Sequence, residues 1–175
     1  MSVRLLRLTP SLLLELQKNE GWAVGDAGTI LNTSDAGARW TPQASGSSEP
    51  LAGVHFFDAN TGWAVGNTGT ILKTTDGGDS WAAQSSPNTA TLNTVYFFDL
   101  QTGWAVGNSG TIINTVDGGE NWLLQFSMSR GGSGTLVNLT DLCFANATTA
   151  WVVGDNGNIF HTTDGGSSWN AQNSK

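Results

Sequence analysis

The sequence predicts an all-β fold, a β-propeller of four repeats with four antiparallel strands in each blade. One segment occurs four times, with its leading tryptophans at Trp22, Trp63, Trp104 and Trp151 and spacings of 41, 41 and 47 residues. Its copies read GWAVGDAGTILNTSDAGARW, GWAVGNTGTILKTTDGGDSW, GWAVGNSGTIINTVDGGENW and AWVVGDNGNIFHTTDGGSSW. Glycine supplies 23 of the 175 residues and only 12% are charged, which is typical of short strands joined by many turns. This length suits one domain, either a closed four-bladed ring or an open partial propeller.

Residues 1–10 come before the first repeat. The stretch from Val3 to Leu8 alternates loosely and includes Arg4 and Arg7. We expect a strand here that pairs with the last blade and so closes a free sheet edge. Thr9-Pro10-Ser11 interrupts the apolar run and Glu15 ends it, so we expect part of the folded domain rather than a signal peptide.

The first blade is predicted at about residues 11–45 and is the least regular. Glu15 stands where the second and third repeats carry Phe56 and Phe97. The shared register favours a strand here over a short helix from Ser11 to Glu20. Terminal repeats are often atypical because one of their faces lacks a neighbour.

The second blade, at about residues 50–86, gives the clearest strand pattern. Apolar, β-prone runs cover Leu51–Asp58, Trp63–Gly66, Thr70–Thr74 and Trp81–Gln84, and glycine-containing turns separate them. The third blade at about 91–126 and the fourth at about 138–172 align onto the same frame.

Each unit ends with the motif Thr-x-Asp-x-Gly-x-x-Trp, known as the Asp-box or bacterial neuraminidase repeat. In a hairpin turn the aspartate accepts hydrogen bonds from turn amides, the glycine adopts a backbone conformation closed to other residues, and the tryptophan packs beneath the turn. Four aspartates on four blades are spread around a ring, whereas acid–base pairs need carboxylates within about 10 Å. We therefore interpret the motif as structural. Its residues are Thr33, Asp35, Gly37, Trp40, Thr74, Asp76, Gly78, Trp81, Thr115, Asp117, Gly119, Trp122, Thr162, Asp164, Gly166 and Trp169.

The eight tryptophans fall two per repeat at fixed positions. A tryptophan can bury about 150–250 Å² of surface, so a chain with few other large side chains is expected to keep most of them in the core. Stacking against carbohydrate is the alternative.

Several classes of function and site are disfavoured by composition. The net charge is −7 and no basic stripe exists, which argues against nucleic-acid binding. No apolar stretch is long enough to cross a bilayer. Cys143 is the only cysteine and is expected to be a buried or half-buried thiol, while His55 and His161 occupy unrelated repeat positions. We predict no metal, no cofactor and no catalytic residue.

The repeats differ most in the connection before the fourth blade. It holds the six extra residues that lengthen the spacing from 41 to 47, and it carries Phe126, Met128 and Arg130. A flexible linker and a partner-contacting loop both fit this composition. Arg4 and Arg7 form a second candidate contact for a partner.

The joined motif T-G-W-A-V-G-x-x-G-T-I-L-x-T-x-D-G-G-x-x-W closely resembles the photosystem II stability/assembly factor family, over about Leu12 to Gln172. The resemblance implies a propeller without enzymatic activity that binds proteins on the lumenal or periplasmic side of a membrane. It implies a role in assembling a photosynthetic reaction-centre complex, or a place in that complex as a bound subunit. Family members usually have about seven blades and an arginine-rich patch, whereas this chain has four repeats and scattered arginines.

Two alternatives come from other classes. Sialidases and related glycosidases carry Asp-boxes, but the sole tyrosine, Tyr96, lies beside strand phenylalanines and Arg39 lies inside an Asp-box. A glycan-binding, lectin-like module is the other alternative.

Overall fold

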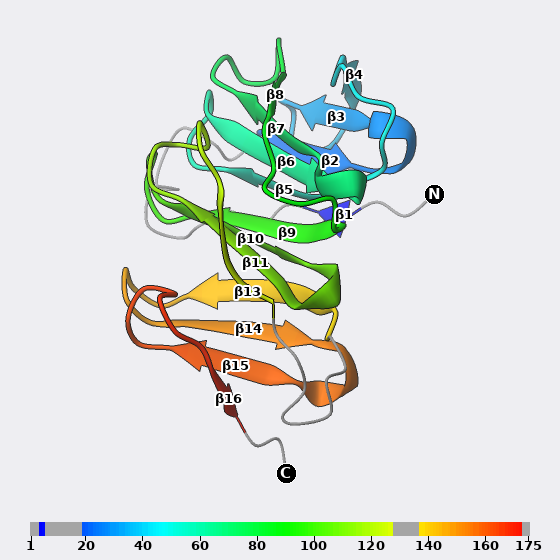
Figure 1. The fold of residues 1–175 in the computed structure, drawn as a ribbon. Coiled ribbons are helices and arrows are strands. Elements are labelled where there is room, and N and C mark those ends of the chain that lie inside the picture. The colour runs from blue at the N-terminus through cyan, green and yellow to red at the C-terminus, as the bar shows by residue number, and fades with distance from the viewer. Residues whose placement is uncertain (1–3, 6–18, 128–136, 173–175) are drawn as a thin grey trace.

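The computed structural model describes residues 4–5, 19–127 and 137–172, which form four four-stranded antiparallel sheets (Figure 1). Each sheet takes its strands in chain order and makes one blade. The strands of the four blades, in order, are β1 (Arg4–Leu5), β2 (Gly21–Val24), β3 (Ile30–Thr33) and β4 (Thr41–Gln43); β5 (Leu51–Phe56), β6 (Gly62–Gly66), β7 (Ile71–Thr74) and β8 (Ala82–Gln84); β9 (Leu92–Phe97), β10 (Gly103–Gly107), β11 (Thr111–Thr115) and β12 (Leu123–Ser127); and β13 (Leu139–Phe144), β14 (Ala150–Gly154), β15 (Ile159–Thr162) and β16 (Asn170–Gln172).

The blades follow one another as an open arc, with blade 1 and blade 4 at opposite ends (Figure 1). Among the described strands, none of blade 1 pairs with any of blade 4. The first strands of neighbouring blades, β5, β9 and β13, lie next to one another. The all-β class and the four-stranded repeats predicted from the sequence are confirmed, and the described arc is not a closed ring.

The N-terminal segment is placed differently from the prediction. We expected residues 1–10 to supply a strand for the last blade, but Arg4 pairs with Val24 and Leu5 with Ala23 in the first blade. Because β2 would otherwise present unpaired backbone groups at its edge, these two residues complete their own sheet. The strand expected near Glu15 falls within residues 6–18, outside the described residues.

The core lies between blades. A tryptophan from the second strand of one blade meets a phenylalanine from the first strand of the next, and these aromatic pairs, two stacked and one tilted, repeat along the array. The ring centroids are 3.6 Å apart for Trp22–Phe56, 3.4 Å for Trp63–Phe97 and 4.1 Å for Trp104–Phe144.

The Asp-box of each following blade forms part of this contact. The indole N–H of Trp22 donates to the carbonyl of Gly77, and that of Trp63 to the carbonyl of Gly118, each at 3.2 Å. In these two interfaces the turn that ends one blade therefore also fixes the tryptophan of the blade before it, whereas the buried indole N–H of Trp104 has no hydrogen-bond partner among the described residues.

Within the turn, the Asp-box side chains bond to one another and to the backbone. The Thr74 hydroxyl donates to Oδ1 of Asp76 at 2.7 Å and accepts from the Gly78 N–H at 2.9 Å, while the Ser80 N–H donates to the same carboxylate at 3.0 Å. The Ser80 hydroxyl, the Ser80 N–H and the Thr74 hydroxyl hold the pKa of Asp76 at about 2. The carboxylate is thus used in organising the turn.

Cys143 corrects one prediction, because its thiol is exposed rather than buried or half-buried. The equivalent residues of blades 2 and 3 are His55 and Tyr96, whose rings lie 5.1 Å apart across the blade interface. Cys143 belongs to blade 4, the end of the array, where no described blade follows to cover it.

Candidate functional site

The predicted partner contacts fall largely outside the described residues. Arg7, Met128 and Arg130 lie in residues 6–18 and 128–136, which are not described. Arg4 lies in β1, and Phe126 lies in β12, paired with Ile112. Their role in partner binding stays a prediction.

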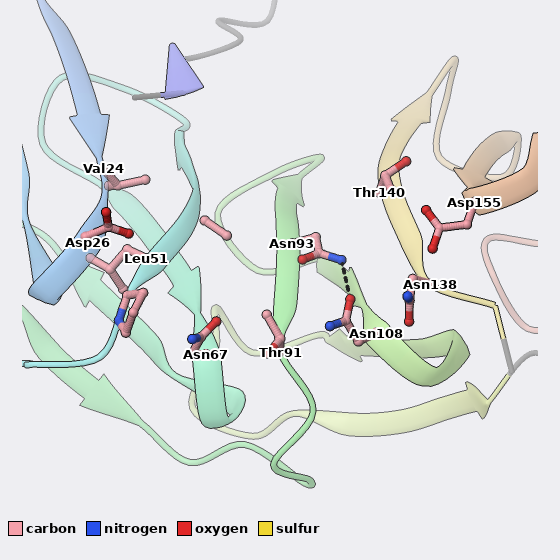
Figure 2. Close-up of a pocket in the computed structure, with 12 residues that line it drawn as sticks. Val24, Asp26, Leu51, Asn67, Thr91, Asn93, Asn108, Asn138, Thr140 and Asp155 are labelled. Atoms are coloured by element: carbon pink, nitrogen blue, oxygen red, sulfur yellow. Dashed lines mark hydrogen bonds between the residues drawn. The ribbon is translucent and has the colours of Figure 1, made fainter. Parts of the chain in front are cut away.

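A pocket of about 570 Å³ lies on the face of the array at which the strands β5, β9 and β13 begin (Figure 2). Turns from all four blades gather on this face. The lining residues are Val24, Asp26, Pro50, Leu51, Ala52, Asn67, Thr91, Asn93, Asn108, Asn138, Thr140 and Asp155.

Four of these residues occupy the same position in the four repeats. Each begins a short 3₁₀ turn after the second strand: η1 (Asp26–Gly28), η2 (Asn67–Gly69), η3 (Asn108–Gly110) and η4 (Asp155–Gly157). Because the blades are arranged along an arc, the residues at this turn position in successive blades lie near one another, and chemically similar side chains line one pocket.

Backbone contacts fix the direction of each turn. The N–H of Asn67 donates to the carbonyl of Pro50 at 2.9 Å, and the equivalent bond from Asn108 to Thr91 measures 2.8 Å. Gly69 has a φ of 70°, and a Cβ there would lie 2.2 Å from the carbonyl oxygen of Asn88. Only glycine fits this turn, which keeps the preceding asparagine at the pocket wall.

An amide network joins the third and fourth blades. The side-chain amide of Asn93 donates to Oδ1 of Asn108 at 3.0 Å (Figure 2). It also donates to the carbonyl of Leu139 at 2.7 Å. Oδ1 of Asn138 accepts from the backbone N–H of Ser109 at 3.1 Å. These bonds orient three asparagine side chains in the lining and hold the blades in register.

In the described part of the lining, the charged side chains are two carboxylates. Asp26 and Asp155 come from the first and fourth blades and lie on opposite sides of the pocket in Figure 2, with uncharged amides and hydroxyls between them. Among the described residues, this lining contains no lysine, arginine, histidine or aromatic side chain. The described lining therefore offers hydrogen-bond donors and acceptors to a polar ligand.

Among the residues that the structure describes, no cluster of three or more histidine, cysteine, aspartate or glutamate side chains could hold a metal ion. Nor does any helix in this part of the chain have the length and apolar character needed to cross a membrane.

In the sequence, Asp26, Asn67, Asn108 and Asp155 each stand two places before a glycine and are interpreted as turn formers, and no local pattern marks Asn93 or Asn138. The repeat pattern could have identified Asp26, Asn67, Asn108 and Asp155 as neighbours, because equal positions in successive blades face the same side of an array. The other two are positioned by contacts between blades, which no local pattern reports.

The family model described as "Photosynthesis system II assembly factor YCF48" matches this chain in three overlapping segments, residues 11–85, 46–129 and 79–175. No curated protein matches the sequence.

Solved structures show the same fold at low sequence identity. YCF48 bound to D1 peptide is 20% identical with a TM-score of 0.56, over 89% of this chain and 79% of that one. YCF48 from Cyanidioschyzon merolae is 16% identical with a TM-score of 0.62, over 95% of this chain and 62% of that one. A GH74 enzyme from Niastella koreensis is 17% identical with a TM-score of 0.67, over 87% of this chain but only 27% of the enzyme.

Proposed function

Because this chain belongs to the photosystem II assembly factor family, we propose that it is a non-enzymatic protein that binds a peptide segment of a photosynthetic membrane complex. The resemblance drawn from the repeated motif is confirmed by the family match. A solved YCF48 structure that holds a D1 peptide supports a peptide as the ligand. The same binding would serve a transient assembly factor or a bound subunit.

The observation that carries this proposal is the amide-lined pocket. Asn67, Asn93, Asn108 and Asn138 line it from the second, third and fourth blades. A peptide backbone presents an N–H and a C=O at every residue, and a carboxamide can bond to both. Side-chain amides distributed along an arc thus match an extended segment without requiring charge on the ligand.

The charges of the pocket narrow the choice of segment. Asp26 and Asp155 are the only charged side chains among the described residues of its lining. A peptide that ends in a free carboxylate would meet repulsion, whereas an internal or basic segment would not. We propose that the ligand is an internal or basic segment of a reaction-centre subunit.

We further propose that the protein acts as a peripheral protein on the extracytoplasmic side of the membrane, in the periplasm or lumen. The motivation is the family's implied site of action. Fractionation of source cells, with the protein recovered from periplasmic or lumenal extracts after a salt wash of the membranes, would test this placement. Recovery with the cytoplasmic fraction alone would overturn it.

Asn67→Ala tests the pocket with little disturbance of the fold, because the Asn67 side chain makes no hydrogen bond within the described chain. Labelled synthetic peptides from the extramembrane segments of reaction-centre subunits would be titrated and followed by fluorescence anisotropy. Loss of one or two amide hydrogen bonds should weaken binding about 3- to 10-fold. Asn170→Ala is the matched control, since Asn170 is exposed on β16 and outside the lining.

A parallel deletion of Ser127 to Gly134 separates this site from the predicted loop contact. If the peptide binds in the pocket, the deletion leaves affinity within about 2-fold while Asn67→Ala lowers it. Loss of binding on deletion, with Asn67→Ala at wild-type affinity, would assign the contact to the loop and refute the pocket.

A further inference from the structure

The face that blade 4 presents at the end of the array has the composition of a blade interface. In blades 1 to 3, a tryptophan and a valine of the second strand and an isoleucine of the third point toward the next blade and are between 0% and 3% exposed. In blade 4, Trp151 is 40% exposed and Val153 is 39% exposed, and Ile159 is partly exposed. We refer to Trp151, Val153, Ile159 and Cys143 as the blade-4 end face.

The three internal interfaces indicate what this face would accept. Each tryptophan contacts a phenylalanine of the next blade, and the first two donate their indole N–H to the next Asp-box carbonyl. Trp151 instead stacks on His161 of its own blade, with centroids 4.8 Å apart. Among the described residues, the Trp151 ring therefore lacks the phenylalanine that its three equivalents contact, and its indole N–H lacks the carbonyl that Trp22 and Trp63 bond.

The opposite end of the array carries the complementary features. Ala36 occupies the Asp-box position whose carbonyl accepts an indole N–H at Gly77 and Gly118. Trp40 is 36% exposed, whereas its equivalent Trp122 is 5% exposed. A Cβ built at Gly62 would lie 2.7 Å from a phenylalanine ring, but one built at Gly21 meets only Thr33 and Trp40 among the described residues.

We propose that two copies of this chain associate head to tail, with the blade-4 end face of one copy against blade 1 of the other. Trp151 packs on Trp40 of the partner copy and donates its indole N–H to the carbonyl of Ala36. Two such contacts related by a twofold axis join two sets of four blades, and the resulting ring lies within the range of about four to eight blades that propellers adopt. Both end faces are then covered.

A second copy is the occupant that the observations favour. The end face repeats the tryptophan, valine and isoleucine of surfaces that bind a blade of the same kind three times within the chain. Exposed tryptophan at the centre of an apolar patch is typical of a protein interface. The net charge of −7 on each copy opposes association, so the test belongs at physiological ionic strength, where exposed charges are screened over about 8 Å.

Sedimentation velocity over a concentration series provides the first test. The wild-type chain is expected to form a dimer, and Trp151→Ser is expected to raise the dissociation constant at least about 30-fold, as for loss of a central aromatic anchor. Leu123→Ser is the matched control, because Leu123 is 60% exposed on β12 and lies away from both ends. A wild-type monomer at every concentration, or a dimer unaffected by Trp151→Ser, would overturn the proposal.

Mixing two variants distinguishes head-to-tail contact from contact between two blade-4 faces. Trp151→Ser and Trp40→Ser should each be monomeric alone, because every contact needs one tryptophan from each copy. Mixed together, they retain one intact contact and should form a 1:1 pair. Circular dichroism establishes that both are folded, and absence of the mixed pair between folded variants would contradict the head-to-tail arrangement.

Cys143 gives a readout that needs no substitution. It is the only cysteine, it is exposed, and its register partner in the sheet is Trp151. Labelling by a maleimide should slow at least about tenfold as the dimer forms, because the thiol becomes covered, and prelabelled protein should remain monomeric. A labelling rate independent of concentration, in samples that contain dimer, would exclude this face as the contact.

Discussion

A single methyl group added at Gly62 would test the packing of the blade interfaces. Gly62→Ala places a Cβ 2.7 Å from the ring of Phe56, about 1 Å closer than carbon atoms pack comfortably. Phe56 is stacked on Trp22 at 3.6 Å with an interplanar angle of 12°, so its ring has no room to retreat in parallel. The ring must tilt.

Blade 4 shows the tilted arrangement. Ala150 stands at the position of Gly62, and the corresponding pair Trp104–Phe144 has a centroid distance of 4.1 Å and an interplanar angle of 33°. Overpacking of this kind costs about 1–3 kcal/mol, and replacing a strand glycine by alanine returns about 0.5–1 kcal/mol. We expect Gly62→Ala to lower the free energy of unfolding by about 1–2 kcal/mol, or the Tm by about 2–8 °C for a chain of this size.

Urea unfolding followed by tryptophan fluorescence measures the stability, and near-UV circular dichroism reports the stacked pair. Gly21→Ala is the internal control, because the Cβ there is 3.3 Å from Thr33 and 3.6 Å from Trp40 with no described phenylalanine above it. Its stability should stay within about 0.5 kcal/mol of wild type or rise. The reasoning fails if Gly62→Ala is as stable as wild type, or if Gly21→Ala is equally destabilising.

Three further predictions concern the core and the turns. Trp63→Phe removes the indole N–H that donates to the Gly118 carbonyl in a buried site. In urea titrations this change should lower the free energy of unfolding by about 1–3 kcal/mol. Trp151→Phe should leave the free energy of unfolding nearly unchanged, because Trp151 is exposed. Burial lowers the pKa of His55 from 6.5 to about 4. The stability that depends on neutral His55 is therefore complete above pH 6.5 and is lost as the pH falls through 4. His55→Tyr, which copies Tyr96, should flatten the decline in Tm between pH 6.5 and 4. Hydrogen bonds from neighbouring residues hold the pKa values of Asp76, Asp117 and Asp164 at about 2, below the ordinary 3.8. The stability that these carboxylates contribute is therefore complete above pH 3.8 and is lost as the pH falls through 2. A Tm that does not fall between pH 3.8 and 2, or that falls equally in Asp76→Asn, would contradict the stabilising role of these carboxylates in the turns.

The strands could be predicted because their determinants are local. The run Trp63–Gly66 lies within β6, and Thr70–Thr74 and Trp81–Gln84 each begin one residue before β7 and β8. Alternation of apolar residues and glycine-containing turns act over a few residues, and four copies of one pattern reduce the ambiguity of each.

The candidate pocket could be predicted only in part. Repetition alone places Asp26, Asn67, Asn108 and Asp155 on one side of the array, but no pattern indicates that Asn93 bonds to Leu139 of the next blade. The expected contacts at Arg7, Met128 and Arg130 lie outside the described residues, and they remain predictions beside the pocket.

By itself, the sequence determined the all-β class and the four-stranded blade, since these follow from periodicity and turn chemistry within each repeat, and its joined motif carried the resemblance to the family. Only the tertiary structure decided which equivalent residues are covered. Trp104 and Trp151 share one motif, yet one is buried and the other is 40% exposed, and Cys143 is exposed where His55 is buried. The physical reason is that local sequence sets which face of a blade is apolar, whereas burial requires a neighbour, and a neighbour is a property of position in the array.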